Sequence, residues 1–244
     1  MMPVTPSVKG NCRNCRLNSL CLPQKLPQQD IGELARIVQS RRPIRRGAYL
    51  FQAGNHFHSI FAVRIGSMKT STLLPNGDEH ISGFHLPGEI LGLDAIGSRS
   101  HPSASVALET THVCEIPFDE LESLGERAPA LQRQLLRIMS RELSAEHGTT
   151  HLLSRRSAEQ RLALALLGFA DRFASRGLSR SQFRLSMSRL DLANYLGLVP
   201  ETMSRTFRRL ETQGLLSVAG KEVALIDSAA LGELAHGASA SEIP

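Results

Sequence analysis

The chain has 244 residues, 41% of them hydrophobic, and a formal net charge of +5, which suits a globular protein of one large or two modest domains. No run of eighteen apolar residues occurs, so no membrane-spanning helix is expected, and the opening residues MMPVTPSVKGNC lack the apolar core of a signal peptide. We therefore expect a cytoplasmic protein, in which thiols stay reduced and clustered cysteines indicate metal binding or catalysis before disulfides.

Three of the four cysteines lie close together near the N-terminus, in the stretch NCRNCRLNSLCLP. They are Cys12, Cys15 and Cys21, and the fourth, Cys114, lies far along the chain in a predicted strand. Zinc sites usually carry two Cys-x2-Cys pairs, and the second pair is missing here. A short loop with three ligands and one remote ligand better suits an iron–sulfur cubane. Zinc and unrelated thiols remain alternatives, and we treat residues 1–28 as a cysteine-rich cluster-binding segment.

Residues 29–126 carry the pattern of a small antiparallel β-structure. Between Gly47 and Ile116, short apolar runs such as YLFQAG and SIFAVRIGSMKTSTLL are interrupted by turn residues, and glycines recur throughout. Asn76-Gly77 is typical of a hairpin turn. Many short strands at close spacing indicate a roll or barrel. We therefore expect an N-terminal β-roll sensor domain within an α+β fold.

Residues 127–154 are predicted to form one long helix with a narrow apolar stripe. The stripe consists of Leu135, Met139 and Leu143, which recur every four residues. A stripe this narrow is most simply buried against the same helix of a second copy, which predicts a homodimer. Glu146 continues the stripe and would face its own mate across a two-fold axis, which weakens the dimer. The alternative is a Glu146 that faces solvent beside the seam.

The excess positive charge is confined to one third of the chain. From Arg155 to Lys221 there are twelve Lys or Arg residues against five Asp or Glu, so this third carries +7 and the remainder −2. Such a distribution indicates a polyanionic partner, here double-stranded DNA; the alternative is a solvated basic surface. We assign residues 155–236 to a DNA-binding domain and expect residues 237–244 to form a flexible tail.

The stretch SRLDLANYLGLVPETMSRTFRRLETQGLL has the features of a helix-turn-helix motif. Ser188 and Asp191 make a helix start, a variant of the capping box. Gly197 ends that helix, and Pro200 occupies the first position of the next, where its missing N–H costs nothing. The following residues LLSVAGKEVALID predict two short strands, which makes the motif a winged one.

The second helix of this motif has polar residues at the end that enters the major groove. Glu201, Ser204 and Arg205 lie on one face at i, i+3 and i+4. Arg205 can donate to guanine, Glu201 can accept from cytosine, and Ser204 can contact thymine. Arg208 and Arg209 suit phosphate contacts, and we add Thr202 to the DNA-binding surface. The alternative is a surface helix with an internal Glu–Arg pair.

These motifs resemble the FNR-type branch of the Crp/Fnr transcription regulators, from Cys12 to about Asp227, in the same order. The four cysteines match the family's ligands for an oxygen-labile [4Fe-4S] cluster in spacing and order. Glu201-x-x-Ser204-Arg205 matches its base-reading motif, which implies half-sites of the TTGAT type. The stretches GFHLPGEILGL and VCEIPF are also similar. The resemblance implies a cyclic-nucleotide-binding-like roll, a long dimerisation helix and a winged helix-turn-helix.

The resemblance also implies a mechanism. Without oxygen the intact cluster favours pairing of the long helices, and the dimer binds a palindromic site; in oxygen both are lost. Glu146 falls where the family has an acidic residue that makes dimerisation conditional, and contacts with RNA polymerase map to residues 72–81 and 173–183. Two departures stand out: Pro200 replaces an aliphatic residue, and Arg16 follows Cys15, where it can tune cluster reactivity.

Two other functions are disfavoured by the residues. Cyclic-nucleotide-responsive relatives hold the ligand's phosphate with an Arg-Ser pair, but here Pro102-Ser103 occupies that place and Arg99 lies three residues early, so a phosphate would lack its main cation. An enzyme is not indicated, since the nine histidines show no metal spacing and no Gly-rich phosphate loop or nucleophile elbow is present.

Overall fold

The computed structural model describes residues 12–237, with the side chains of residues 145–155 excepted. The chain divides into two compact units, and the boundary between them lies between Leu143 and Ser144. Within the described residues, no helix combines the length and the apolarity that crossing a bilayer requires.

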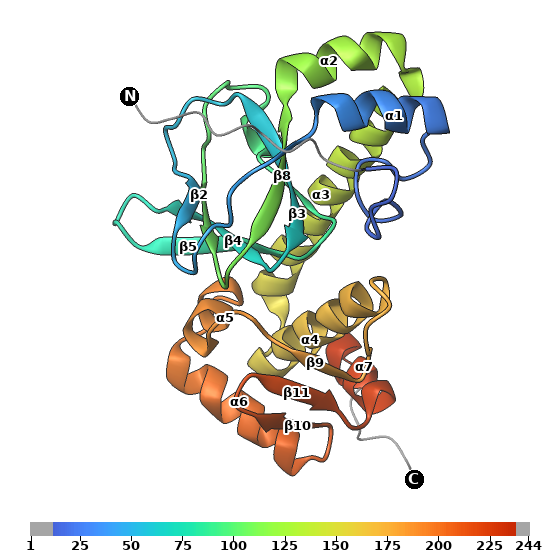
Figure 1. Cartoon of the computed structure of the whole chain (residues 1–244). Coiled ribbons are helices and arrows are strands. Elements are labelled where there is room, and N and C mark those ends of the chain that lie inside the picture. Colours follow the sequence, from blue (N-terminus) through green and yellow to red (C-terminus); the bar gives the residue numbers. More distant parts are fainter. Residues whose placement is uncertain (1–11, 238–244) are drawn as a thin grey trace. The chain divides into compact units, whose positions relative to one another are not determined.

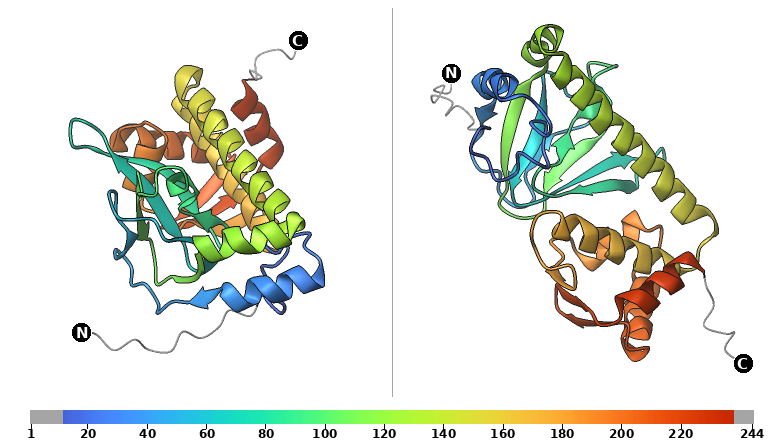
Figure 2. Two further views of the ribbon diagram at one scale, coloured as in Figure 1. Left: turned by 90° about the horizontal axis from the view of Figure 1, so that it is seen from above. Right: turned by 90° about the vertical axis from the view of Figure 1, so that its right-hand side faces the viewer.

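The first unit contains two four-stranded antiparallel sheets that form the predicted roll (Figures 1 and 2). The first sheet has the order β1 (Gln39–Ser40), β8 (His112–Pro117), β3 (Ser59–Ile65) and β6 (Ile90–Leu91). The second has the order β2 (Tyr49–Phe51), β7 (Ala104–Ala107), β4 (Met68–Leu73) and β5 (Glu79–His85), and a short 3-10 helix, η1, spans Leu93–Ala95.

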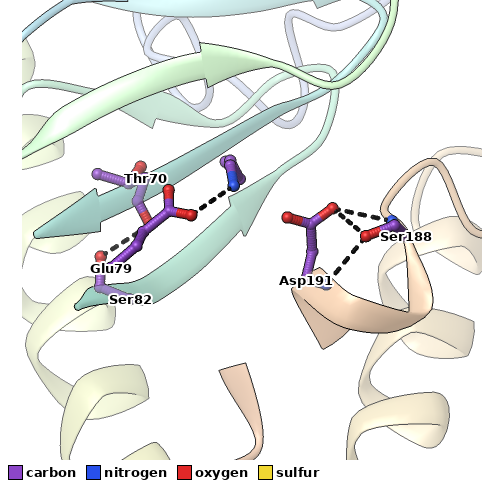
Figure 3. A network of polar contacts seen from close by, with 6 residues as sticks. Thr70, Glu79, Ser82, Ser188 and Asp191 are labelled. Atoms are coloured by element: carbon purple, nitrogen blue, oxygen red, sulfur yellow. Dashed lines mark hydrogen bonds and ion pairs between the residues drawn. The ribbon is translucent and has the colours of Figure 1, made fainter. Parts of the chain in front are cut away.

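The hairpin predicted at Asn76-Gly77 is confirmed. Strands β4 and β5 pair up to Leu73 and Glu79, and Asn76 accepts a hydrogen bond from the backbone N–H of Asp78 at 3.1 Å, while Gly77 adopts a positive φ of 86°. Across the hairpin, Glu79 forms an ion pair of 3.0 Å with Lys69 (Figure 3). The turn therefore follows from the left-handed backbone that Gly77 adopts without strain and from the side-chain oxygen of Asn76, which bonds to the backbone two residues on.

Three helices accompany the roll: α1 (Gln28–Ile37), α2 (Phe118–Arg127) and α3 (Pro129–Arg155). Helices α1 and α2 pack side by side. The long helix was predicted from its apolar stripe, whereas α1 and α2 were not predicted, because each is only ten residues long and short periodic stretches are ambiguous. The core beneath them includes the fully buried side chains of Leu22, Leu34, Ile60, Ile116 and Leu131.

The second unit confirms the predicted winged helix-turn-helix. It consists of α4 (Ala158–Ala174), β9 (Gln182–Arg184), α5 (Arg189–Tyr195), α6 (Pro200–Thr212), β10 (Leu216–Ala219), β11 (Glu222–Leu225) and α7 (Ser228–His236). The wing is a three-stranded sheet of order β10-β11-β9. The third strand was not predicted, because only three residues pair in it, with Phe183 opposite Val223.

The predicted signals at the ends of α5 and α6 are all present. Ser188 and Asp191 form a complete capping box at the start of α5 (Figure 3). Gly197 follows α5 with a φ of +60°, which glycine adopts without strain, and Pro200 is the first residue of α6. Arg161 donates to the carbonyl of Leu196 at 3.2 Å, so a cation from α4 satisfies the end of α5.

Candidate metal centre and nucleic-acid interface

A series of tight turns brings the three N-terminal thiols together. We call residues 12–25 the cysteine loop. Within it, the backbone N–H of Cys15 donates to the carbonyl of Cys12 at 3.4 Å, and that of Cys21 donates to the carbonyl of Leu17 at 2.9 Å. The loop therefore folds back on itself over a few residues, which places three thiols on one side of the first sheet.

All four cysteines line one small pocket of about 30 Å³. Cys114 reaches it from β8, where it pairs with Ser40 of β1 and Ala62 of β3. The other lining residues are mainly apolar and come from the cysteine loop, α1 and the first sheet: Leu17, Leu22, Pro23, Leu34, Val38, Ala62, Val63 and Ile116, together with Asn18 and Arg64. A thiol carried by a central strand is thus held against a loop far away in sequence.

The four thiols lie close enough to influence one another's ionisation. Burial raises the pKa of Cys12 to about 11 and that of Cys21 to about 12, and it also raises the pKa of Cys114. Repulsion between the thiolates adds to these increases. It acts between every pair of the four cysteines, Cys15 included. Arg64 opposes the increase at Cys12 and Cys114.

Four thiols are a donor set that fits a metal centre, although they lie too far apart in this structure to hold a metal ion directly. Within the described part of the chain, no three His, Cys, Asp or Glu side chains stand close enough to hold a metal ion. Neutral thiols in an apolar pocket become ligands when a metal displaces their protons.

Two glycines allow the cysteine loop to lie close to the rest of the unit. A Cβ atom on Gly88, which has a φ of +95°, would lie 2.9 Å from Cβ of Leu20. On the other side, the guanidinium of Arg13 covers Gly32 of α1. These two contacts were not predicted, because no sequence signal pairs a loop residue with a particular distant glycine.

Helix α6 separates its apolar and polar residues cleanly. Its buried side consists of Met203, Thr206, Phe207 and Leu210. Its exposed side carries the residues predicted to contact DNA: Glu201, Ser204, Arg205 and Arg208 are exposed, and Thr202 is half-buried. The hydroxyl of Ser204 donates to the carbonyl of Pro200 at 3.0 Å. The helix therefore presents these side chains together on one face.

Contacts from three other elements fix α6 in place. Cζ of Arg189, in α5, lies 3.3 Å from the centroid of the Phe207 ring. Glu211 accepts a hydrogen bond from the backbone N–H of Val218 in the wing at 2.8 Å. Arg209 forms an ion pair of 2.9 Å with Glu159 of α4. Side chains that read bases must be held in a fixed position, and these contacts hold the helix that carries them.

A pocket of about 310 Å³ adjoins the exposed face of α6. Its lining combines the first residues of α4 with α6: Ser157, Ala158, Glu159, Thr202, Arg205, Thr206 and Arg209. Two of these residues, Thr202 and Arg205, were predicted from the sequence to belong to the DNA-binding surface. The others were missed, although the capping box formed by Ser157 and Gln160 is a helix-start signal that could have located this end of α4.

The predicted stripe on α3 divides into inner and outer residues. Leu135 is partly buried against the core of the first unit and Met139 is half-buried, whereas Leu143 is 57% exposed. Leu136, which was not part of the predicted stripe, is 62% exposed. The side chain of Glu146 lies outside the described residues.

Two surfaces predicted to contact a partner also carry exposed leucines. In the segment 72–81, the hairpin tip exposes Leu73 and Leu74, and in the segment 173–183 the loop after α4 exposes Leu178.

Two family models match the chain. The model for a cyclic nucleotide-binding domain matches residues 41–128, and the model for a Crp-like helix-turn-helix domain matches residues 160–234. The first coincides with the roll and the beginning of the helices that follow it, and the second coincides with the second unit.

Similar proteins span nearly the same length. The transcriptional activator protein anr of Pseudomonas aeruginosa is 46% identical over 229 residues, which cover 94% of each chain. The fumarate and nitrate reduction regulatory protein of Escherichia coli K12 is 43% identical over 225 residues, which cover 92% of this chain and 90% of the relative. The structure of FixK2 from Bradyrhizobium japonicum is 29% identical, with a TM-score of 0.75 and coverage of 81% of this chain and 97% of that one. The first two relatives are named as a transcriptional activator and a regulatory protein, and not as enzymes.

Proposed function

Because the chain belongs to the FNR/ANR type of the Crp/Fnr family of transcription regulators, we propose that it controls transcription in response to oxygen. The observation that carries this proposal is the shared pocket of the four cysteines. We assign Cys12, Cys15, Cys21 and Cys114 as the ligands of a [4Fe-4S] cluster. When bound, such a cluster supplies an oxygen-labile cross-link between the cysteine loop and β8.

The ligands act on the chain through the position of the cysteine loop. With all four thiolates engaged, the loop is fixed to β8, and α3 pairs with the same helix of a second copy. We assign Leu135, Met139, Leu143 and Glu146 to this pairing. In oxygen the cross-link is lost, the loop is released from β8, and the dimer dissociates. Since the equilibrium between the two states needs a shift of only a few kcal/mol, a local change of this kind is sufficient.

The paired chains present two copies of α6 to a palindromic site with TTGAT-type half-sites. Arg205 donates to guanine, Glu201 accepts from cytosine, and Ser204 contacts thymine. Thr202 and Arg208 contact the phosphate backbone, which adds affinity without sequence information. The exposure of these side chains on one face of a well-supported helix favours this assignment.

The proposed domains follow one another along the chain. Residues 1–28 form the cluster-binding segment, 29–126 the roll and 127–154 the dimerisation helix. Residues 155–236 form the DNA-binding domain and 237–244 the tail. The segments 72–81 and 173–183 contact RNA polymerase, as expected of an activator. The protein acts in the cytoplasm.

A cyclic nucleotide is not part of the proposal, although the family model of the roll carries that name. Ser103, at the place of the phosphate-binding pair, is buried and donates to the carboxylate of Asp94 at 2.7 Å. Arg99 forms an ion pair of 2.9 Å with Asp119 of α2. A phosphate would therefore meet a carboxylate and would find Arg99 already paired.

Cys114→Ala tests the four-thiolate site. We expect it to abolish oxygen-dependent binding to a TTGAT palindrome, measured by fluorescence anisotropy without oxygen and again in air. Ser40→Ala, which changes the neighbour of Cys114 on β1, serves as the control and should leave the response intact. Retained anaerobic control in Cys114→Ala would refute the ligand set, and one bound zinc with no response to air would favour a zinc-stabilised regulator.

A further inference from the structure

A side chain of the cysteine loop contacts the long helix directly. Gln24, three residues after Cys21, accepts a hydrogen bond through Oε1 from Nε2 of Gln134 at 3.5 Å and another from Nη1 of Arg141 at 3.4 Å. Both donors lie on α3, two turns apart. The end of the loop that carries the third cysteine is therefore linked to two positions of the helix.

The same loop and the same helix also share one hydrophobic core. Leu22, which directly follows Cys21, is fully buried, and Leu26 is buried nearby. They belong to the cluster that contains Leu131 of α3, and Leu135 and Ile138 pack against that cluster. Because protein interiors are close-packed, the loop cannot shift without moving the first turns of α3 or opening a void.

The hydrogen bonds between Gln24 and α3 are incomplete in this structure. Distances of 3.4 and 3.5 Å are long for hydrogen bonds. Gln134 is only 1% exposed, and its Oε1 atom has no hydrogen-bond partner within the described residues. An unsatisfied buried acceptor is costly. Since the amide of Gln24 carries a donor as well as an acceptor, a closer approach of the loop would form a reciprocal amide pair with Gln134 and a shorter bond to Arg141.

We propose that Gln24 is the positioning residue through which the state of the cysteine loop sets the state of α3. A loop drawn closer completes the contact and fixes the helix, whose exposed Leu136 and Leu143 then meet a second copy. A loop that is released keeps only the two long bonds. The inference rests on the proposed function, since it specifies how the thiol site controls dimerisation.

Variants of Gln24 separate this role from simple packing. Gln24→Ala removes the acceptor and the donor. Gln24→Glu loses the donor to Gln134 but keeps the acceptor for Gln134 and Arg141, and its charge strengthens the bond to Arg141, which offsets the loss and should preserve the coupling. Gln29→Ala, which removes an exposed glutamine in the first turn of α1, is the matched control.

The first experiment measures the dimer dissociation constant by sedimentation equilibrium without oxygen, for cluster-loaded and for metal-free protein. In Gln24→Ala we expect the loaded protein to dimerise about fivefold more weakly, as loss of one hydrogen bond predicts, and the metal-free protein, in which the two bonds to Gln24 are long, to change by less. Gln24→Glu and Gln29→Ala should behave as the wild type does. An equal change in both states, or none, would overturn the inference. If the wild type itself shows no dependence on the cluster, the proposed function fails first.

The second experiment uses metal-free protein alone. Coupling between two sites is reciprocal, so a change on α3 must alter the cysteine loop. Arg141→Ala should raise the rate at which iodoacetamide alkylates Cys21 by about threefold, a fraction of one hydrogen bond's effect, whereas Arg133→Ala, also exposed on α3, should not. Identical rates in the two variants would refute the link between Gln24 and α3, whatever the metal content of the wild type.

Discussion

Leu20 of the cysteine loop packs directly over Gly88, at the turn before β6. An added Cβ on Gly88 would lie 2.9 Å from Cβ of Leu20, and the φ of Gly88 is +95°. The contact fixes the loop from the side of the roll, since there is no room for any larger residue at position 88. The position of three of the four candidate ligands thus depends in part on this glycine.

Gly88→Ala should displace the cysteine loop and destabilise the protein. The backbone strain alone costs about 1–3 kcal/mol, and the clash with Leu20 adds to it. Urea denaturation of metal-free protein measures the loss, and iron per chain after anaerobic reconstitution measures the effect on the site, which should fall. Gly97→Ala is the control, because nothing lies within 4 Å of its added Cβ and its φ is not in the left-handed region. Equal iron content in the two variants would show that the contact does not position the loop.

His101 should make the stability of the roll depend on pH. Its ring is buried and stacks on Phe51 at a centroid distance of 3.9 Å. Burial lowers its pKa from 6.5, repulsion from His58 lowers it further, and Asp94 opposes the change. The unfolded chain therefore gains a proton at a higher pH than the folded one, so the free energy of unfolding is greatest above pH 6.5 and falls as the pH drops below it.

His101→Phe, which keeps a ring against Phe51, should remove part of this pH dependence. Urea denaturation at pH 7.5 and 5.5 gives the change in the free energy of unfolding for each protein. The comparison within each variant cancels any cost of fitting the larger ring. A variant that loses as much stability on acidification as the wild type would show that His101 is not the responsible group.

Arg205 and Arg208 should have different effects on DNA binding. Arg205→Ala should cost about 1–3 kcal/mol at the cognate half-site and little on random DNA. Arg208→Ala should weaken binding to both DNAs alike and reduce the salt slope by about one. Anisotropy titrations at several salt concentrations distinguish the two, and an equal loss on both DNAs in Arg205→Ala would assign it to phosphate.

The elements that were predicted correctly are those with local signals. Ser188 with Asp191, Gly197, Pro200 and Asn76-Gly77 each act on their own few residues, and each lies where the sequence indicated. The cysteine spacing likewise selected the four thiols that line one pocket.

The features that could not be predicted depend on contacts between distant residues. Gln24 and Gln134 are 110 residues apart, and neither carries a motif that names the other. The third strand of the wing and the short helices α1 and α2 are stabilised by their neighbours in the fold more than by their own sequence.

The most direct test of the central claim is iron, zinc and acid-labile sulfide per chain in protein purified without oxygen, with gel filtration before and after exposure to air. The account predicts about four irons and four sulfides per chain and a dimer that dissociates in air. One zinc, or no metal, with an elution volume that air does not change would contradict it.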